Sequence, residues 1–379
     1  MKLLIFLILL FIPLFIFRYL QTQTRLVPGD KVKITTRINQ EPSIKSDQQI
    51  IRVNQNISIY LPRFPEYHYG DRLEIVGTVE KSEKGYYLKN PEAQLIEKHG
   101  FLAEIKRKMV SLFAKTLPEP ESSLAAGVTF GVKEGFTPEF YNSLKNAGVL
   151  HVVVASGTNV TLVARVLIVT FVLFTTRRVA IIGALMGIWL YAFLVGLEAP
   201  ITRAAIMGSL VFSAQELGKV YFAWWGLVIS ALVMLLIAPN WITDIGFLLS
   251  FGATAGILAF EKPIILRLRS GLSFFSEKKT TTERDSHAPT GPVPKFFVND
   301  LSTSFAAQIV VTPILLFYFG QFAPWSPLVN GALLWTIAPM MALGFIGALL
   351  GLIVEPLGQF FIFLTYPLAF LFVKVVELF

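Results

Sequence analysis

The sequence predicts a polytopic α-helical membrane protein with a small, OB-like β-barrel domain near its N-terminus. Of the 379 residues, 54% are hydrophobic and 15% are charged, whereas a soluble globular chain carries about 25% charged residues. Several windows reach the roughly 20 apolar residues needed to cross a hydrocarbon core. One long stretch, residues 27–97, instead alternates apolar with polar residues, a pattern typical of half-buried strands.

The chain opens with a basic residue and a long apolar run, "MKLLIFLILLFIPLFIFRYL". No small-residue cleavage site follows this run. We therefore expect residues 1–20 to form an uncleaved transmembrane anchor.

The stretch 27–97 reads as about five short strands separated by Gly, Pro, Asn and Asp. A hairpin turn is predicted near Lys84–Gly85. The size and strand number favour an OB-like barrel, which we expect on the extracytoplasmic side.

Residues 101–118 predict a basic amphipathic helix lying on the membrane surface. Pro118 and Pro120 end it. Its apolar residues recur on one helical face, and its basic residues supply the other. The apolar positions are Phe101, Leu102, Ile105, Met109, Leu112 and Phe113, and the basic ones are Lys106, Arg107, Lys108 and Lys115.

Residues 122–379 predict the polytopic membrane domain. Many of its apolar segments contain Gly or Pro, so we expect broken or re-entrant helices among them. The expected segments lie near 148–175, 179–197, 199–217, 220–237, 241–260, 301–323, 326–354 and 356–377.

Charge sets the expected topology. With the barrel outside, Arg177, Arg178 and Lys219 fall in the cytoplasm. The Ser/Thr/Pro-rich loop 262–299, with seven Lys or Arg against three acidic residues, also falls there. This agrees with the positive-inside rule, and the same count places the C-terminal end outside.

The sequence offers few residues that could carry out catalysis or bind a metal. The chain has no Cys, and its four His show no metal-ligand spacing, so we expect neither a metal nor another cofactor. A serine hydrolase built on Ser156 would need a base, and His151 lies off the serine's face of a regular helix. His151 suits a helix cap or interface better. We expect no enzyme activity.

A polar break interrupts the apolar segment that begins near residue 148. Gly permits a bend, and Ser, Thr and Asn can cap the helix ends that a bend creates. A half-helix starting there would direct its N–H groups into a cavity and favour an anion. The alternative is that small residues let two helices pack closely. The polar positions are Ser156, Gly157, Thr158, Asn159 and, farther on, Arg165.

Charged and polar residues also occur within later apolar segments. Glu198 and Arg203 flank Pro200, and charges at such depth usually face a bundle interior or water. The two could instead neutralise each other. Asp244 could line a path or cap a helix near the surface, and Gln308 is a further polar position.

In the predicted barrel, aromatic residues lie beside arginines. Such a pattern can stack unpaired bases and contact phosphates, but it also occurs in membrane-interface belts. Ten Lys or Arg balance ten acidic residues over 27–97, so no basic face follows from charge. The candidate DNA contacts are Arg52, Arg63, Tyr67, Tyr69 and Arg72.

Four ordered stretches resemble the ComEC-type competence family: "NSLKNAGVLHVVVASGTNVTLVA", "GLEAPITRAAIMGSLV", "ITDIGFLLSFGATAGILAF" and "AAQIVVTPILLFYFGQFAPWSPLVNGALLW". The resemblance extends over most of residues 27–379. Asn159 stands where the family signature often has His. The matching positions are Ser156, Gly157 and Asn159; Gly196, Leu197, Glu198, Arg203 and Ala204; Gly246, Phe247, Leu249, Ser250 and Phe251; and Ser326, Pro327 and Asn330.

The resemblance implies an inner-membrane channel that admits single-stranded DNA during natural transformation, in contact with membrane lipid. The metal motif of the family's metallo-β-lactamase-like domain is missing, so we expect a separate nuclease. A DNA receptor and a cytoplasmic motor or helicase are also expected, since the chain has no P-loop. The expected path residues are His151, Ser156, Gly157, Thr158, Asn159, Arg165, Glu198, Arg203, Asp244, Ser250, Gln308 and Asn330. An exporter of a small solute or polysaccharide, and a scaffold without transport, remain alternatives.

Overall fold

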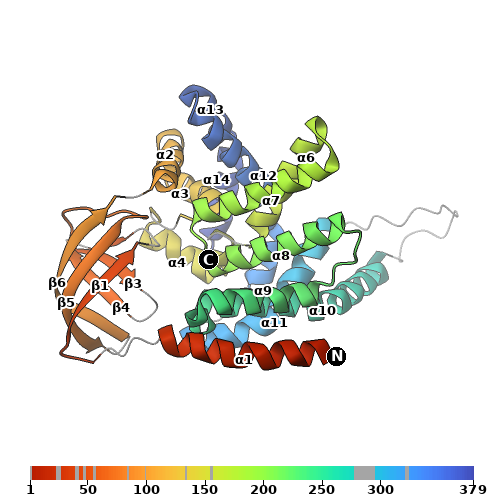
Figure 1. The fold of residues 1–379 in the computed structure, drawn as a ribbon. Coiled ribbons are helices and arrows are strands. Elements are labelled where there is room, and N and C mark those ends of the chain that lie inside the picture. Colours follow the sequence, from red (N-terminus) through yellow and green to blue (C-terminus); the bar gives the residue numbers. More distant parts are fainter. Residues whose placement is uncertain are drawn as a thin grey trace, which may run out of the picture.

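A sheet domain (residues 31–97) and a larger helical domain (residues 101–379) lie side by side in the computed structural model (Figure 1). The structure describes residues 2–22, 27–38, 42–45, 48–53, 57–82, 85–98, 100–132, 135–153, 157–276, 295–320 and 324–379.

The sheet domain is one mixed sheet in the order β1-β5-β6-β4-β3-β2. Neighbouring strands are antiparallel except β4 and β6, which are parallel. Alternate side chains form its core, in which Ile59, Leu73 and Ile75 are fully buried. The strands are β1 (Lys31–Arg37), β2 (Ser43–Lys45), β3 (Gln48–Val53), β4 (Ile57–Pro62), β5 (Arg72–Ser82) and β6 (Gly85–Glu97).

The predicted small β domain is present, but its barrel is not closed. β1 and β2 end the sheet, and no pairing between described residues joins them. The predicted hairpin links β5 and β6, whose pairing runs up to Ser82 and Gly85, while Lys84 lies outside the described residues. Alternation along a strand fixes which face is buried but not how the edges meet, so the sequence could not decide closure.

On the sheet domain's surface, Glu80 is held between two partners. Its carboxylate accepts a hydrogen bond from Lys89 Nζ at 2.8 Å and another from the Tyr87 hydroxyl. The bond from Lys89, and then that from Tyr87, hold the pKa of Glu80 below its usual value.

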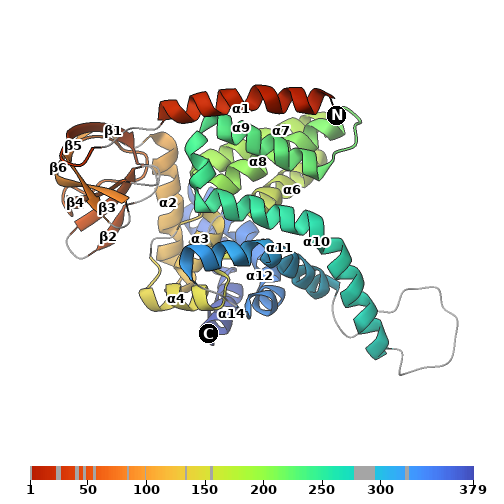
Figure 2. The ribbon, with the colours of Figure 1, turned by 90° about the horizontal axis from the view of Figure 1, so that it is seen from below.

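α1 (Lys2–Thr22) covers the predicted anchor and lies along α9 (Ala223–Ile237) of the helical domain (Figures 1 and 2). It contains Pro13. The remaining helices are α2 (Phe101–Thr116), α3 (Glu121–Phe130), α4 (Pro138–Asn146), α5 (Leu150–Val153), α6 (Gly157–Phe174), α7 (Arg177–Val195), α8 (Ala199–Glu216), η1 (Pro239–Thr243), α10 (Ile245–Ser276), α11 (Lys295–Phe319), α12 (Ser326–Gly351), α13 (Glu355–Phe363) and α14 (Tyr366–Val376).

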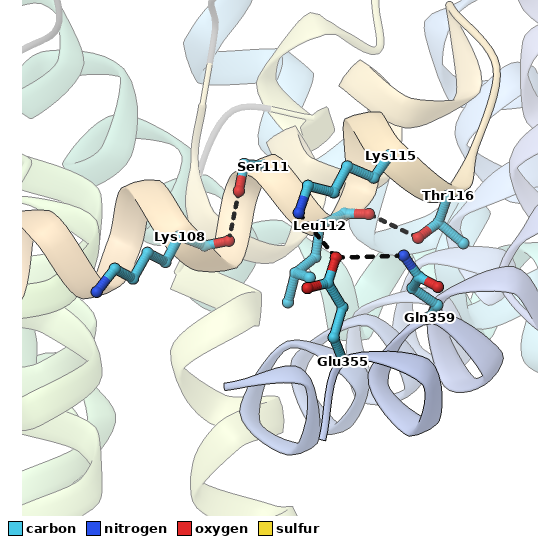
Figure 3. Close-up of polar contacts among 7 residues, drawn as sticks. All are labelled: Lys108, Ser111, Leu112, Lys115, Thr116, Glu355 and Gln359. Atoms are coloured by element: carbon cyan, nitrogen blue, oxygen red, sulfur yellow. Dashed lines mark hydrogen bonds and ion pairs between the residues drawn. The ribbon is translucent and has the colours of Figure 1, made fainter. Parts of the chain in front are cut away.

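α2 is amphipathic as predicted, and much of its apolar face packs on protein. Met109, Leu112 and Phe113 are buried in the helical core, and α2 contacts α3, α12 and α13. On its outer side, Lys115 Nζ lies 2.7 Å from Glu355 Oε1, and Gln359 contacts the same carboxylate (Figure 3). Placement of α2 at a membrane surface stays a prediction.

Four described helices are long and apolar enough to cross a membrane: α7, α10, α11 and α12. The consecutive helices α13 and α14, bent by 43°, make a fifth if counted as one span. The apolar segment near 148–175 contains α5 and α6. Residues 157–159 of the predicted polar break are helical, and residues 154–156 lie outside the described part of the chain. Together with the composition, these helices indicate a membrane protein.

The spanning helices differ in how much of them lies inside the protein. In the most apolar stretch of α7 and of α12, 44% of the residues are buried. The corresponding share is 17% in α11 and 6% in α10. α12 and α13 approach closely through glycines, since a Cβ on Gly358 would lie 2.3 Å from Gly351 Cα and 2.6 Å from Gly347 O. The helical core therefore centres on α12, while α10 packs on α11 with few fully buried residues.

Candidate functional site

A tight turn between α7 and α8 positions the charged residues that the sequence singled out. α7 ends at Gly196, with φ of 126°, and Leu197 also has a positive φ, of 50°. Glu198 is the N-cap residue of α8, Pro200 occupies its first turn, and the Thr202 hydroxyl donates to the Leu197 carbonyl at 3.0 Å. We call residues 195–199 the α7–α8 turn.

Arg203 lies one turn into α8 and joins three helices. Its Nη1 donates to the Ser250 carbonyl of α10 at 3.0 Å. Its Nη2 lies against Gly157, the first residue of α6, where an added Cβ would come within 2.6 Å of that nitrogen. The absence of a side chain at Gly157 thus admits the guanidinium. We call Gly157, Arg203 and Ser250 the arginine site.

The arginine site retains unused hydrogen-bonding capacity. Arg203 Nε and Ser250 Oγ are shielded from solvent, and neither has a hydrogen-bond partner in the described parts of the chain. A buried polar atom left unpaired costs about 1–3 kcal/mol. These two atoms therefore provide a reason for a polar group to bind there.

The positive charge at the arginine site has no carboxylate partner in the parts of the chain that the structure describes, so mutual neutralisation by Glu198 and Arg203 is not what the structure shows. A guanidinium in a low-dielectric environment attracts an anion strongly. The arrangement suits a phosphate or another oxyanion.

The side chain of Asn159, two residues after Gly157 in α6, points toward α3. It is 1% exposed, and its Nδ2 donates to the Val128 carbonyl at 2.8 Å. The Tyr191 hydroxyl donates to the next carbonyl, that of Thr129, at 3.0 Å. Both carbonyls belong to the last turn of α3, so Asn159 and Tyr191 satisfy acceptors at a helix C-terminus.

Asn330 forms a separate buried polar group. Its Nδ2 lies 3.3 Å from Ser326 Oγ, which donates to the Gly148 carbonyl at 3.0 Å. Asn330 is 3% exposed, and its Oδ1 has no partner among the described residues. This group ties the start of α12 to the chain between α4 and α5.

Other predicted path residues lie elsewhere. Asp244 Oδ1 accepts from the Phe247 backbone N–H at 2.7 Å, which is the helix cap considered as its alternative. Arg165 is exposed on α6, and Gln308 is partly buried on α11. Ser156 lies outside the described residues, as do the side chains of His151 and Thr158.

One of the candidate DNA contacts of the sheet domain, Tyr67, is a core residue. Tyr67 is 7% exposed in the sheet core, and its hydroxyl donates to the Ala93 carbonyl. Burial, and then the nearby Asp71, raise the pKa of Tyr67. Arg72 is exposed, and the side chain of Arg52 lies outside the described part.

The most exposed ring of this region is Phe64, which is 70% exposed and 5.7 Å from the Arg63 guanidinium, and Tyr60 is 42% exposed. Tyr69 faces Lys106 of α2, whose ammonium lies 5.0 Å from the ring centroid. The aromatic composition of the 60–69 stretch could have suggested Phe64, but it could not separate core rings from exposed ones. Among the described residues, no group of three His, Asp or Glu gathers in a way that could hold a metal.

Comparison with known proteins assigns most of the helical domain. The model of the Competence protein family matches residues 128–379. The chain is also 24% identical to ComE operon protein 3 of Bacillus subtilis (strain 168) over 221 residues, which is 58% of this chain and 25% of that protein. The chain thus spans about a quarter of that relative's length. No solved structure matches.

The matched region includes the α7–α8 turn and all three residues of the arginine site. It also includes α7, α10, α11 and α12, the four described helices found long and apolar enough to cross a membrane. The chain therefore belongs to the Competence protein family.

Proposed function

We propose that the chain forms the path by which a single strand of DNA crosses the plasma membrane during natural transformation. The observation that carries the proposal is Arg203, a partly buried guanidinium that touches α6, α8 and α10 and has no paired carboxylate among the described residues. A phosphodiester supplies the missing charge, and it can accept from Arg203 Nε and from Ser250 Oγ.

The sheet domain lies outside the cytoplasm in this proposal, as an OB-like module that receives the strand. Arg63 and the exposed Phe64 ring support this role, because guanidinium and aromatic faces stack on unpaired bases. Transport is passive, so a DNA receptor delivers the strand, a separate nuclease generates it and a cytoplasmic motor or helicase pulls it.

Uptake of labelled DNA by the transformable host tests the proposal. Deleting the gene should abolish internalisation, and Arg203→Ala should lower it by about tenfold or more, since a hydrogen bond to a charged group contributes about 1.5–3 kcal/mol. DNA uptake by Arg203→Lys should fall between that of the parent chain and that of Arg203→Ala, because an ammonium keeps the charge but lacks the planar set of donors of a guanidinium.

Arg178→Ala is the matched control, since Arg178 is 82% exposed and pairs with Glu216 on the surface. Its uptake should equal that of the parent chain when membrane abundance is equal. Normal DNA internalisation in the deletion strain would reject the proposal. Accumulation of an unexported polysaccharide in that strain would favour the exporter instead.

A further inference from the structure

Lys106 occupies the junction between the sheet domain and the helical domain. It lies on α2, which runs between the sheet domain and the other helices (Figure 2). Its Nζ donates to the Val195 carbonyl of α7 at 2.8 Å and lies 5.0 Å from the centroid of the Tyr69 ring. One ammonium of α2 therefore contacts both the sheet domain and the end of α7.

Each contact suits a cation. Val195 is the last residue of α7, where helix carbonyls lack intrahelical partners and the dipole favours positive charge. The Tyr69 ring attracts the same ammonium through its π face. Lys106 is partly buried, so water weakens these interactions less than at the surface.

The Val195 carbonyl, which accepts the hydrogen bond from Lys106, lies close along the chain to the arginine site. Val195 begins the α7–α8 turn, which leads through Gly196, Leu197 and Glu198 into α8. Arg203 lies within the second turn of that helix. A short covalent path therefore connects the Lys106 contact to the arginine site.

We infer that Lys106 is a positioning residue that fixes the sheet domain over the α7–α8 turn. Tyr69 supplies the sheet domain's side of the contact, and the Val195 carbonyl supplies the side of the helical domain. Two other basic residues of α2 have different partners: Lys108 pairs with Glu104 on the same helix, and Lys115 pairs with Glu355 of α13.

The absence of cysteine makes the inference testable by spin labelling. Thr35→Cys in β1 and Asn142→Cys in α4 place one label on an exposed position of each domain. In the full chain in detergent, pulsed electron resonance should give one narrow distribution of distances between them. Lys106→Met should broaden that distribution by about twofold or more, because the ammonium that both domains share is lost.

Two further variants separate positioning from general stability. Lys106→Arg should restore the narrow distribution, and Lys108→Met, on the same helix, should leave it unchanged. Tyr69→Leu removes the ring while leaving the Val195 hydrogen bond, and it keeps the test decisive if Lys106→Met does not fold. Broadening is again expected.

Distributions as narrow in Lys106→Met and Tyr69→Leu as in the parent chain would overturn the inference. So would equal broadening in Lys108→Met. The measurement needs no DNA and no transport, so it can fail or succeed independently of the proposed function.

Discussion

Replacing Asn159 with Leu removes a buried amide that donates to the Val128 carbonyl and also hydrogen-bonds Tyr191. Leu and Asn have similar size, so the substitution removes the amide donor without opening a large space. The Val128 carbonyl then loses the donor that lies 2.8 Å away. An unpaired buried carbonyl costs about 1–3 kcal/mol, and for a domain of this size that lowers Tm by roughly 2–6 °C.

Thermal unfolding in detergent, followed by tryptophan fluorescence, measures the shift. Asn159→His should unfold near the parent temperature, because an imidazole N–H can donate to the same carbonyl. Thr254→Val is the control: its hydroxyl donates to the Ser250 carbonyl within its own helix, so its loss should change Tm little. An Asn159→Leu chain as stable as the parent would refute the capping role.

Two further predictions concern packing and pH. Gly358→Ala should destabilise the chain by about 1–3 kcal/mol, because the added Cβ meets backbone atoms of Gly351 and Gly347 that cannot rotate away. Gly208→Ala, whose Cβ would lie 3.8 Å from Ile188, should be neutral or stabilising by up to about 1 kcal/mol in the same assay. Glu80→Gln should lower Tm more at pH 6 than at pH 3. The pKa of the Glu80 carboxyl is lowered in the folded chain, so its charge stabilises the fold at pH values above its unfolded pKa of about 4.3. This stabilisation is lost as the pH falls through the pKa that the carboxyl has in the folded chain. An equal decrease in Tm at both pH values would contradict the lowered pKa of Glu80.

Helical periodicity and apolar length predicted the helical domain well. Five predicted segments match α7, α8, α9, α11 and α12 to within several residues, and the segment near 241–260 covers only the first half of α10 (Ile245–Ser276). The last segment, near 356–377, is instead two helices bent by 43°. Apolar content marks such a segment but does not report where its axis turns.

Long-range contacts limited what could be inferred about the site. Arg203 was predicted to matter, but its packing on Gly157 and its bond to Ser250 join positions 46 and 47 residues away along the chain. Asn159 shares the motif of Gly157 yet points to α3, because neighbouring residues on a helix face different directions. Tyr67 and Phe64 look alike in sequence, and only the sheet decides that one is core and the other exposed.

The close packing of α10 on α11 has a mechanical consequence. A Cβ on Gly256 of α10 would lie 2.5 Å from the Ala306 carbonyl oxygen of α11, and packing of this kind sets the tilt of a membrane helix. The Ser250 carbonyl that holds Arg203 travels with α10. A shift of α10 along α11 would therefore move the acceptor away from the guanidinium, so α11 helps to anchor that guanidinium.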